Sequence, residues 1–584
     1  MPKQEKIEAI RHSLSHIMAM AVVKKFPDAK LGIGPTIDNG FYYDFLLPDK
    51  LSDADLPKLE KQMKKIIQQK IAFNKTVVDK KEALKKVKGE DFKVELINDL
   101  PAGEEISFYE SGNFSDLCAG PHVKDSSEIN PNAFKLTRVA GAYWRGDEKN
   151  PMLTRIYGVA FETKEELEAH LEMLEQAKLR DHRKLGKELD LFTFSEIVGK
   201  GLPLLTPKGS VIRQELERFI VDEETRRGYL RTYTPDIAKV DLYKKSGHWE
   251  HYKNDMYPPM DIDGEQYVLR PMTCPHQFMI YNSRPRSYRE LPLRYAEIAK
   301  LYRKEQSGEL SGLIRVMCFS LVDAHVICTP DQLEEEFAKV VDLVQYGMKV
   351  LGITDYSYRF SKWDPKNEKK YIDNVKAWEA SQDSMKKILD KMKLDYVEAD
   401  DEAAFYGPKL DVQMKNVNGK EDTAFTVQID FAMPEKFDMT YIDKDGKEQR
   451  PMVIHRSSIG CLERTMAFLI EYYAGAFPLW LSPVQIKIIT VGEGHIDFAK
   501  TLAEEFQSHS IRVEVDNSAE TVGNKIRKAA KEKMPYTLVI GDKEMGSDKL
   551  SVRVRGEKDL LNINKKEFIS KIKTNIQNRE LELL

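Results

Sequence analysis

The sequence predicts an α+β protein of several domains: an amino-terminal α+β domain, a connecting helix, a central antiparallel sheet with flanking helices, and a carboxyl-terminal α/β domain. Three observations favour this organisation. The 584 residues exceed what one hydrophobic core usually supports. The spacing of apolar residues changes character along the chain, and only the last part alternates strands and helices regularly. We expect domain boundaries at 1–162, 163–191, 192–483 and 484–584.

The amino-terminal region combines one helix with short strands. A helix is expected around residues 7–26, ahead of the strand-like runs GFYYDF (40–45) and RIYGVAF (155–161). The pattern then becomes charged and helical from residue 164 to about residue 191. Leucines recur there near helical spacing, which predicts a connecting helix with a narrow apolar stripe.

The central region mixes helices with strands that do not alternate as parallel βα units. A helix is expected over 211–227, and strands over LIRVMCFSLVDAHVI (313–327) and FTVQIDFAM (425–433). Such a pattern favours an antiparallel sheet with helices beside it. After Ser482-Pro483 the chain changes again. Four strand-like runs, VQIKIITV, IRVEVD, TLVIGD and KLSVRVR, are separated by helical or turn segments and predict a separate α/β domain.

Composition excludes several classes of protein. Apolar residues make up 41% and charged residues 32%, and 90 basic against 94 acidic side chains give a net charge of -4. This balance excludes a wholly electrostatic binder of nucleic acid but leaves room for local basic surfaces. No stretch approaches the roughly 18 apolar residues of a membrane span, and the first residues lack the apolar segment of a secretory signal. Five scattered cysteines do not indicate a disulfide framework, so a reducing, cytoplasmic compartment is expected.

Three residues of the central region are candidate metal ligands. Cys274, His325 and His455 each stand in an apolar or strand-like segment. A thiolate with two imidazoles suits Zn²⁺ and leaves one coordination position for substrate or water. Their spacing forms no short motif, so buried structural residues are the alternative.

A second group of residues suits a nucleotide. Arg303 and Glu305 precede a Ser/Gly-rich turn, and a strand is expected to resume with Arg315, Met317 and Phe319. Residues two apart on a strand face the same side. Guanidinium groups bind phosphate in bidentate fashion, and a phenyl ring stacks on a purine. The alternative is a surface hairpin with ordinary ion pairs.

A third segment, HRSSIGCLERTMAF from residue 455, runs through a small-residue turn into a helix. Glu463 and Arg464 lie in the first turns of that helix. A helix amino terminus beside an arginine suits a nucleotide phosphate, although a plain strand–turn–helix connection has the same pattern.

Together these segments resemble the class II aminoacyl-tRNA synthetases. Arg303 with Glu305 and Phe319 resembles motif 2, residues 460–464 resemble motif 3, and RRGYLRTYTPDI (226–237) resembles the motif 1 helix and strand at a dimer interface. Further sequence motifs narrow the resemblance to the threonyl-tRNA synthetase family. The resemblance extends from about residue 8 to the carboxyl end. The phrases are MTCP (272–275), VDAH (322–325), FYGPKLD (405–411), VQIDFAMP (427–434) and FPLWLSPVQ (477–485).

This resemblance implies an enzyme that activates L-threonine with ATP and Mg²⁺ and loads it onto tRNA(Thr) as a homodimer. Zinc is expected to hold the amino and hydroxyl groups of threonine, because an apolar pocket alone separates threonine from valine only weakly. The implied zinc ligands are Cys274, His325 and His455, with Asp323 beside them. The implied nucleotide residues are Arg303 (α-phosphate), Phe319 (adenine), Arg464 (γ-phosphate), Glu305 and Arg315; Tyr406, Lys409 and Gln428 are expected to line the threonine and adenylate pocket.

The amino-terminal domain resembles the editing domain shared by threonyl- and alanyl-tRNA synthetases. His12 and His16 are four residues apart on the expected helix, and SDLCAGPH supplies Asp116, Cys118 and His122. The resemblance implies hydrolysis of seryl-tRNA(Thr) by a positioned water, with metal binding as the secondary interpretation. Surface histidines on an ordinary helix are the alternative. The chain starts almost at the editing helix, so the small ubiquitin-like domain that many members carry is expected to be absent.

The carboxyl-terminal domain resembles a class II anticodon-binding domain, which implies that Arg527, Glu544 and Arg553 read bases. Lys531 and Arg555 are expected to add to a basic surface; the alternative is a solvated helix face.

The sequence departs from the usual family motifs at three places. Leu321 stands where glutamine is usual, Cys461 stands where serine is common, and TCPHQ replaces NCPGH. Three alternatives remain at this point: a paralogue that does not charge tRNA, a tRNA-binding scaffold with a decayed site, and a seryl- or prolyl-tRNA synthetase.

Overall fold

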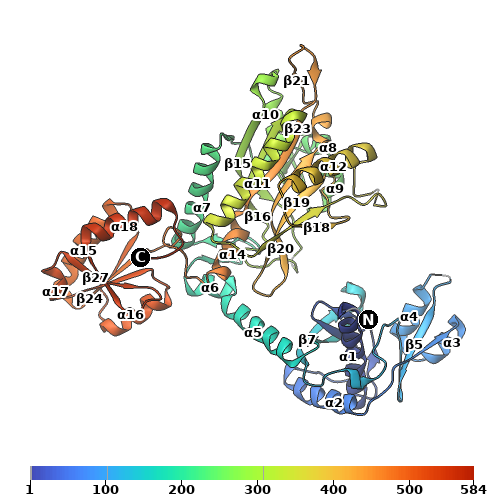
Figure 1. Ribbon diagram of the computed structural model, residues 1–584. Coiled ribbons are helices and arrows are strands. Elements are labelled where there is room, and N and C mark those ends of the chain that lie inside the picture. The colour runs from blue at the N-terminus through green and yellow to red at the C-terminus, as the bar shows by residue number, and fades with distance from the viewer. Residues whose placement is uncertain (1–2, 102, 307, 368) are drawn as a thin grey trace. The chain divides into compact units, whose positions relative to one another are not determined.

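The computed structural model describes residues 3–101, 103–306, 308–367 and 369–584, and the chain divides into two compact units, residues 1–175 and 176–584 (Figure 1). The division falls inside helix α5 (Lys164–Arg180), and helix α6 (His182–Glu188) follows at once. The sequence predicted one connecting helix here. Two form instead because the Asp181 carboxylate accepts a hydrogen bond from Arg183 N at 2.8 Å and caps α6. None of the described helices offers an apolar stretch of bilayer length.

The first unit is built round α1 (Lys3–Lys25), which is buried along most of its length. Ile10, Leu14 and Val22 of this helix lie in a single hydrophobic cluster with two neighbouring elements, the sheet and α2. The main sheet is antiparallel, in the order β1-β3-β8-β7, with β2 beside β3. A smaller antiparallel sheet, β4-β5-β6, packs with α3 and α4. The bounds are β1 Lys30–Leu31, β2 Thr36–Ile37, β3 Gly40–Leu46, α2 Leu56–Gln68, β4 Asn74–Val78, α3 Lys80–Lys86, α4 Asp91–Asp99, β5 Ile106–Ser111, β6 Phe114–Leu117, β7 Phe134–Tyr143 and β8 Met152–Ala160.

The second unit contains an eight-stranded sheet in the order β11-β15-β16-β23-β20-β19-β17-β18. The six strands from β15 to β17 in this order are antiparallel to their neighbours, as the sequence predicted, and the two edge strands are added parallel. The bounds are β11 Leu230–Arg231, β15 Leu293–Tyr302, β16 Cys318–Cys328, β17 Tyr356–Ser361, β18 Tyr396–Ala399, β19 Lys409–Lys415, β20 Glu421–Asp430 and β23 Met452–Cys461.

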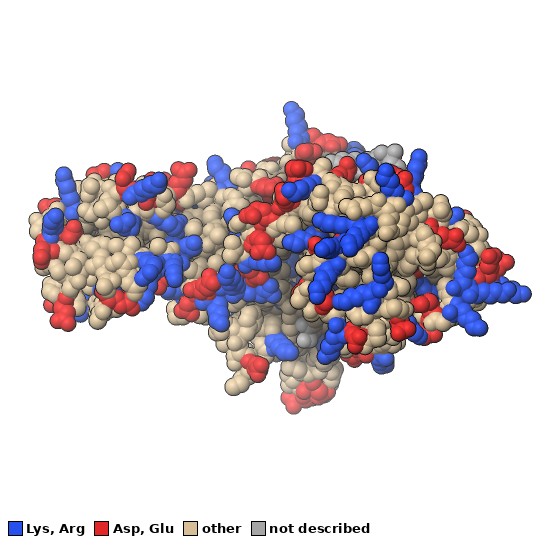
Figure 2. Space-filling model, turned by 90° about the horizontal axis from the view of Figure 1, so that it is seen from below, with Lys and Arg blue, Asp and Glu red and all other residues tan. Residues whose placement is uncertain are grey.

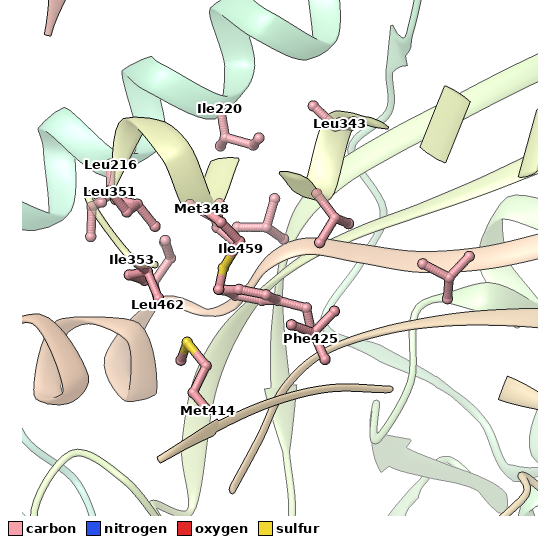
Figure 3. Close-up of a cluster of buried hydrophobic side chains, with 14 of the residues drawn as sticks. Leu216, Ile220, Leu343, Met348, Leu351, Ile353, Met414, Phe425, Ile459 and Leu462 are labelled. Atoms are coloured by element: carbon pink, nitrogen blue, oxygen red, sulfur yellow. The ribbon is translucent and has the colours of Figure 1, made fainter. Parts of the chain in front are cut away.

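Helices cover one face of this sheet. Side chains from α7 (Pro207–Arg226), α11 (Leu333–Val350) and α14 (Leu462–Tyr472) meet the strands in one hydrophobic cluster (Figure 3). Leu216 and Ile220 of α7 and Met348 of α11 contribute to it, with Phe425 and Ile459 from the sheet. Alternation along a strand turns every second side chain away from this cluster. The opposite face of the sheet is therefore free to hold a site.

A smaller α/β fold ends the second unit. Its sheet has the order β25-β24-β26-β27-β28, parallel over the first three strands and antiparallel over the last two pairings. The regular β-α-β-α-β pattern predicted from the sequence is present. The bounds are β24 Ile486–Thr490, α15 Ile496–Ser508, β25 Val513–Asp516, α16 Val522–Lys531, β26 Tyr536–Ile540, α17 Asp542–Met545, β27 Lys549–Val554, β28 Leu560–Asn564 and α18 Lys565–Asn578.

Candidate functional site

A cavity of about 420 Å³ opens on the sheet face opposite the helices. Strand β16 shows how the sequence makes both faces. Its residues 319, 321, 323 and 325 line the cavity, while residues 322, 324, 326 and 328 belong to the hydrophobic cluster under the helices. All twelve residues that the sequence analysis assigned to the metal, nucleotide and threonine sites line this one cavity: Cys274, Arg303, Glu305, Arg315, Phe319, Asp323, His325, Tyr406, Lys409, Gln428, His455 and Arg464.

The three candidate metal ligands converge on one side of the cavity. His325 on β16 and His455 on β23 are cross-strand partners, and their rings lie 4.5 Å apart, edge to face. Cys274 is the first residue of helix α10 (Cys274–Tyr281). One ligand atom from each of the three lies within 4.8 Å of the others, and all three side chains are buried. Segments that are 51 and 130 residues apart in sequence therefore form one triad.

The hydrogen bonds behind the triad suit a metal. His325 Nδ1 lies 2.6 Å from Gln277 Oε1, and His455 Nε2 lies 2.7 Å from Asp430 Oδ2. Because those oxygens accept, each imidazole carries its proton on the outer nitrogen and keeps a lone pair on the other. Burial lowers the pKa of His325 and raises the pKa of the Cys274 thiol, so the pocket favours a neutral imidazole at His325 and makes a lone thiolate costly. A cation in the triad would offset that cost, and the donor set fits zinc.

The nucleotide candidates lie together, although not for the reason the sequence suggested. The guanidinium of Arg303 sits 5.2 Å from the centre of the Phe319 ring. Arg315 binds Glu305 at 2.7 Å, and Arg464 Nε donates to Ile314 O at 3.3 Å. The sequence predicted a strand over 313–327, but β16 begins at Cys318, and Arg315 lies in the turn before it.

The predicted common face of residues 315, 317 and 319 is therefore wrong. Met317 is directed at Gly201, where a Cβ would lie 3.0 Å from Met317 Cγ. Arg315 reaches the cavity from the turn instead.

The threonine candidates form a polar wall next to the triad. The Tyr406 hydroxyl donates to Gln428 Oε1, and the Tyr406 ring lies 4.9 Å from that of His455. Lys409 Nζ pairs with the fully buried Asp411 at 2.9 Å. Burial raises the pKa of Asp323 to about 6, and the nearby His455 and Arg456 oppose that shift. The two unusual residues, Leu321 and Cys461, are cross-strand partners on the same wall.

A second cluster lies in the first unit. His12, His16, Cys118 and His122 offer ligand atoms within 4.8 Å of one another. Cys118 Sγ lies 3.2 Å from His12 Nε2 and 3.3 Å from His122 Nε2. A cavity of about 400 Å³ opens beside them and is lined by His12, His16, Asp116 and Cys118. Burial lowers the pKa of His12, His16 and His122 and raises that of Cys118 to about 11, so the groups are held neutral.

Asp116 belongs to a buried network that the sequence did not reveal. Its Oδ1 pairs with Lys93 Nζ at 2.6 Å, and its Oδ2 accepts from the Tyr43 hydroxyl. His16 Nε2 is 3.7 Å from Asp116 Oδ2. Lys93 and Asp116 are each about 4% exposed in their side chains, so each charge offsets the burial of the other. The lysine lines the cavity, with its ammonium held by Asp116 and by the Tyr43 hydroxyl at 3.3 Å.

The three residues predicted to read bases differ in how exposed their side chains are. Arg527 on α16 and Arg553 on β27 are exposed. Glu544 is partly buried, and one of its oxygens accepts from Gly541 N at 3.0 Å and so caps its own helix, α17. Figure 2 shows groups of Lys and Arg among acidic side chains rather than one continuous basic field.

Arg555 does not add to that surface, contrary to the sequence prediction. Its guanidinium donates to Lys533 O and Phe477 O, both at 2.7 Å, and is therefore a structural anchor.

Several residues of the two sites were missed by sequence reasoning. Asp430 follows Gln428 at an interval of two on β20, so strand alternation contained a signal for it. Gln277 lies one helical turn after Cys274 and was equally detectable. Lys93 gave no signal, because a lysine in a short charged helix is ordinarily solvated.

Three regions of the chain match known protein families. Residues 252–473 match the family "tRNA synthetase class II core domain (G, H, P, S and T)", residues 485–575 match "Anticodon binding domain", and residues 106–157 match "Threonyl and Alanyl tRNA synthetase second additional domain".

Similarity to individual proteins extends over almost the whole chain. A threonine–tRNA ligase of Clostridium botulinum (strain Alaska E43 / Type E3) is 56% identical over 580 residues, which are 99% of this chain and 90% of that protein. A threonine–tRNA ligase of Oceanobacillus iheyensis is 50% identical over 581 residues, with 99% and 90% covered. A crystal structure described as the RNA binding domain of threonyl-tRNA synthetase from Cryptosporidium parvum Iowa II superposes with a TM-score of 0.64 and 33% identity, over 68% of this chain and 98% of that one.

The Clostridium botulinum ligase is more than half identical over nearly the full length of this chain, so the similarity covers both units and the two clusters described above. The chain belongs to the threonine–tRNA ligase family of class II aminoacyl-tRNA synthetases.

Proposed function

We propose that Cys274, His325 and His455 hold a zinc ion that selects threonine during its activation. The convergence of these three buried side chains on one wall of the large cavity carries the proposal. When bound there, Zn²⁺ would supply Lewis acidity toward the amino and hydroxyl groups of the amino acid. Valine, which lacks the hydroxyl, would leave that position and Asp323 unsatisfied. Serine keeps the hydroxyl and is expected to enter.

The remaining residues of the cavity position the two substrates. In this proposal Arg303 binds the α-phosphate, Phe319 stacks on adenine and Arg464 binds on the γ-phosphate side; all three line the cavity, which supports these roles. Glu305 and Arg315, which form an ion pair in the cavity lining, complete the nucleotide site. Tyr406, Lys409 and Gln428 line the threonine and adenylate side. Mg²⁺ would accompany ATP.

The proposed chemistry has two steps. An oxygen of the threonine carboxylate attacks the α-phosphorus of ATP in line, and the bond to the bridging oxygen breaks, so that pyrophosphate leaves. The arginines stabilise negative charge on the phosphates during this step. A ribose hydroxyl at the 3′ end of tRNA(Thr) then attacks the carbonyl carbon of the adenylate, and AMP leaves.

Amino-acid-dependent exchange of ATP with pyrophosphate tests the proposal. Exchange is expected with threonine, more weakly with serine, and not with valine. Equal exchange with valine would contradict the selective role of the triad. Cys274→Ala is expected to lose zinc and exchange while keeping its circular dichroism spectrum. Cys328→Ala, which removes a buried thiol from the opposite face of the same sheet, is the matched control and is expected to keep both.

For the first unit we propose hydrolysis of seryl-tRNA(Thr), with His12, His16, Asp116, Cys118 and His122 as the site. The neutral histidines beside a cavity of about 400 Å³ support a positioned water as the attacking group. Lys93 also lines this cavity, and its ion pair with Asp116 supports a role in holding that carboxylate in place. Metal binding by the same four ligand residues is the secondary proposal.

We further propose a cytoplasmic homodimer that reads the anticodon through Arg527, Glu544 and Arg553. Large apolar side chains exposed near motif 1 support the dimer: Tyr233 is 88% exposed and Leu230 is 51% exposed. Burial of such residues is ordinarily favourable and marks an interface. Sedimentation of the purified protein as a monomer at micromolar concentration would contradict it.

A further inference from the structure

A histidine outside the cavity holds the turn that carries the nucleotide arginines. His182, in the first turn of α6, is buried and makes two side-chain hydrogen bonds. Its Nε2 accepts from Leu313 N at 3.1 Å, and its Nδ1 lies 2.7 Å from Glu471 Oε1 on α14. A nitrogen that accepts from a backbone N–H carries no proton, so Nδ1 carries it and donates to the carboxylate. The imidazole is thereby fixed in one tautomer.

Both ring nitrogens of His182 make hydrogen bonds. This distinguishes His182 from His325 and His455, each of which keeps a lone pair on one nitrogen. Asp181, His182 and Glu471 do bring three ligand atoms within 4.8 Å of one another. However, Asp181 is bound by Arg183 through Nε at 3.0 Å and Nη2 at 2.6 Å. The cluster therefore connects three elements and offers no free imidazole nitrogen to an ion.

The turn that receives this hydrogen bond is tight and built against the ring. Ser311 N donates to Arg315 O at 3.1 Å, and Arg315 N donates back to Ser311 O at 3.2 Å. Gly312 between them has φ +48°, and a Cβ there would lie 2.0 Å from His182 Nε2. Only glycine fits this position, because the backbone lies directly on the imidazole.

Two arginines of the cavity depend on the same turn. Arg315 closes it through the pair of backbone hydrogen bonds with Ser311. Arg464 donates from Nε to the carbonyl oxygen of Ile314, the residue next to the anchored Leu313. A shift of this turn would thus move both guanidinium groups at once, whereas the hydrogen bonds described for His325 and His455 go to Gln277 and Asp430 and not to the turn.

We propose that His182 is a positioning residue for ATP, which sets the place of Arg315 and Arg464 by holding Leu313 against Glu471. This inference rests on the proposed nucleotide roles of the two arginines. It assigns to the α6 segment a part in the affinity for ATP and none in the choice of amino acid.

Two amide substitutions test the two side-chain hydrogen bonds of His182 separately. In His182→Gln the side-chain oxygen reaches the position of Nε2 and can still accept from Leu313 N, while the side-chain bond to Glu471 is lost and only the backbone bond from residue 182 N to Glu471 Oε1 at 3.3 Å is kept. In His182→Asn the amide reaches only the position of Nδ1, so the bond to Glu471 is kept and the bond to Leu313 is lost. The variants remove one hydrogen bond each and introduce no new charge.

The test measures the dissociation constant of ATP without amino acid, and the KM values for ATP and threonine in pyrophosphate exchange. His182→Asn is expected to weaken ATP about fivefold to tenfold, the loss expected for one neutral hydrogen bond and the misplaced arginines. Its KM for threonine should stay within about twofold. His182→Gln should retain wild-type ATP affinity. Equal ATP affinity in the two variants, or a parallel rise in both KM values, would overturn the proposal.

A second variant displaces the same turn without changing the side chain of His182. Gly312→Ala places a methyl group against the imidazole and is expected to weaken ATP as His182→Asn does; because the close contact and the positive φ also strain the turn, its melting temperature is expected to fall, and the ATP dissociation constant is measured well below that temperature. Unchanged ATP affinity in this variant would also count against the inference. The ATP dissociation constant decides the role of His182 by itself. Exchange that does not depend on threonine in the wild type would instead contradict the proposed function.

Discussion

Replacing Asp430 with asparagine tests the proposed zinc site through a residue that does not touch the ion. Asp430 is fully buried. Its Oδ1 accepts from the backbone nitrogens of Ala432 and Met433 at 2.8 and 2.9 Å, and its Oδ2 binds His455 Nε2. In Asp430→Asn the amide oxygen can keep the two backbone bonds. The amide nitrogen then faces His455 Nε2, and two donors oppose each other.

The expected result is a change of tautomer. His455 would move its proton to Nδ1 so that Nε2 can accept from the new amide, and the lone pair directed at Cys274 and His325 would be lost. Removing such a supporting partner typically costs 10- to 100-fold in metal affinity. At about 1.36 kcal/mol for each factor of ten, this is about 1.4 to 2.7 kcal/mol. Burial of the triad makes the upper part of that range the expectation.

The assay is a competitive titration of zinc with a chromogenic chelator, followed by metal analysis of the dialysed protein. Asp443→Asn is the matched control. Asp443 also accepts two backbone N–H groups through Oδ1, from Asp445 and Lys447 at 2.9 Å each, but it is only partly buried and its Oδ2 accepts from Gln449 Nε2 at 3.1 Å instead of a histidine. A zinc dissociation constant in Asp430→Asn within twofold of wild type, with a normal melting temperature, would refute the tautomer argument.

Three further predictions address other parts of the molecule. Glu224→Gln is expected to destabilise the second unit by about 3 to 5 kcal/mol in chemical unfolding, because Arg456 and Glu224 form a fully buried ion pair at 2.6 Å; a loss below 1 kcal/mol would contradict this. His12→Ala combined with His16→Ala should abolish hydrolysis of seryl-tRNA and leave threonine charging intact, whereas His170→Ala, elsewhere in the same unit, should change neither; an unchanged deacylation rate in the double variant would be inconsistent with the proposed role. Removing the metal with a strong chelator should stop threonine-dependent exchange, and zinc should restore it where Mg²⁺ alone does not; full activity without metal would exclude the zinc proposal.

The local sequence pattern was sufficient to predict the fold and much of the site. The antiparallel sheet, the terminal α/β domain and the alternation that turns Asp323 and His325 to one face all follow from the sequence. The pattern failed where strands meet turns, since residues 313–317, apolar apart from Arg315, resemble a strand but belong to the turn anchored by His182 and the segment that follows it. A carboxylate at 181 also ended a helix that its leucines suggested would continue.

The sequence pattern alone could not predict which residues, distant along the chain, meet in the folded protein. Nothing in the spacing of Cys274 and His455 shows that they meet, because the meeting depends on strand order and on register across the sheet. The family resemblance supplied that pairing. It did not supply the partners behind the ligands, such as Gln277, or the lysine buried beside Asp116. These residues are defined by three-dimensional packing, which a linear pattern does not encode.

Leu321 and Cys461 depart from common family wording, and the sheet register makes them neighbours across β16 and β23. What reads as two independent changes along the chain is one altered contact in space, where an apolar side chain meets a thiol in place of an amide meeting a hydroxyl. Side chains directly opposite on antiparallel strands influence each other's energies. Restoring either residue alone would therefore create a mismatched pair, so the effects of the two single restorations are not expected to add up to the effect of the double one.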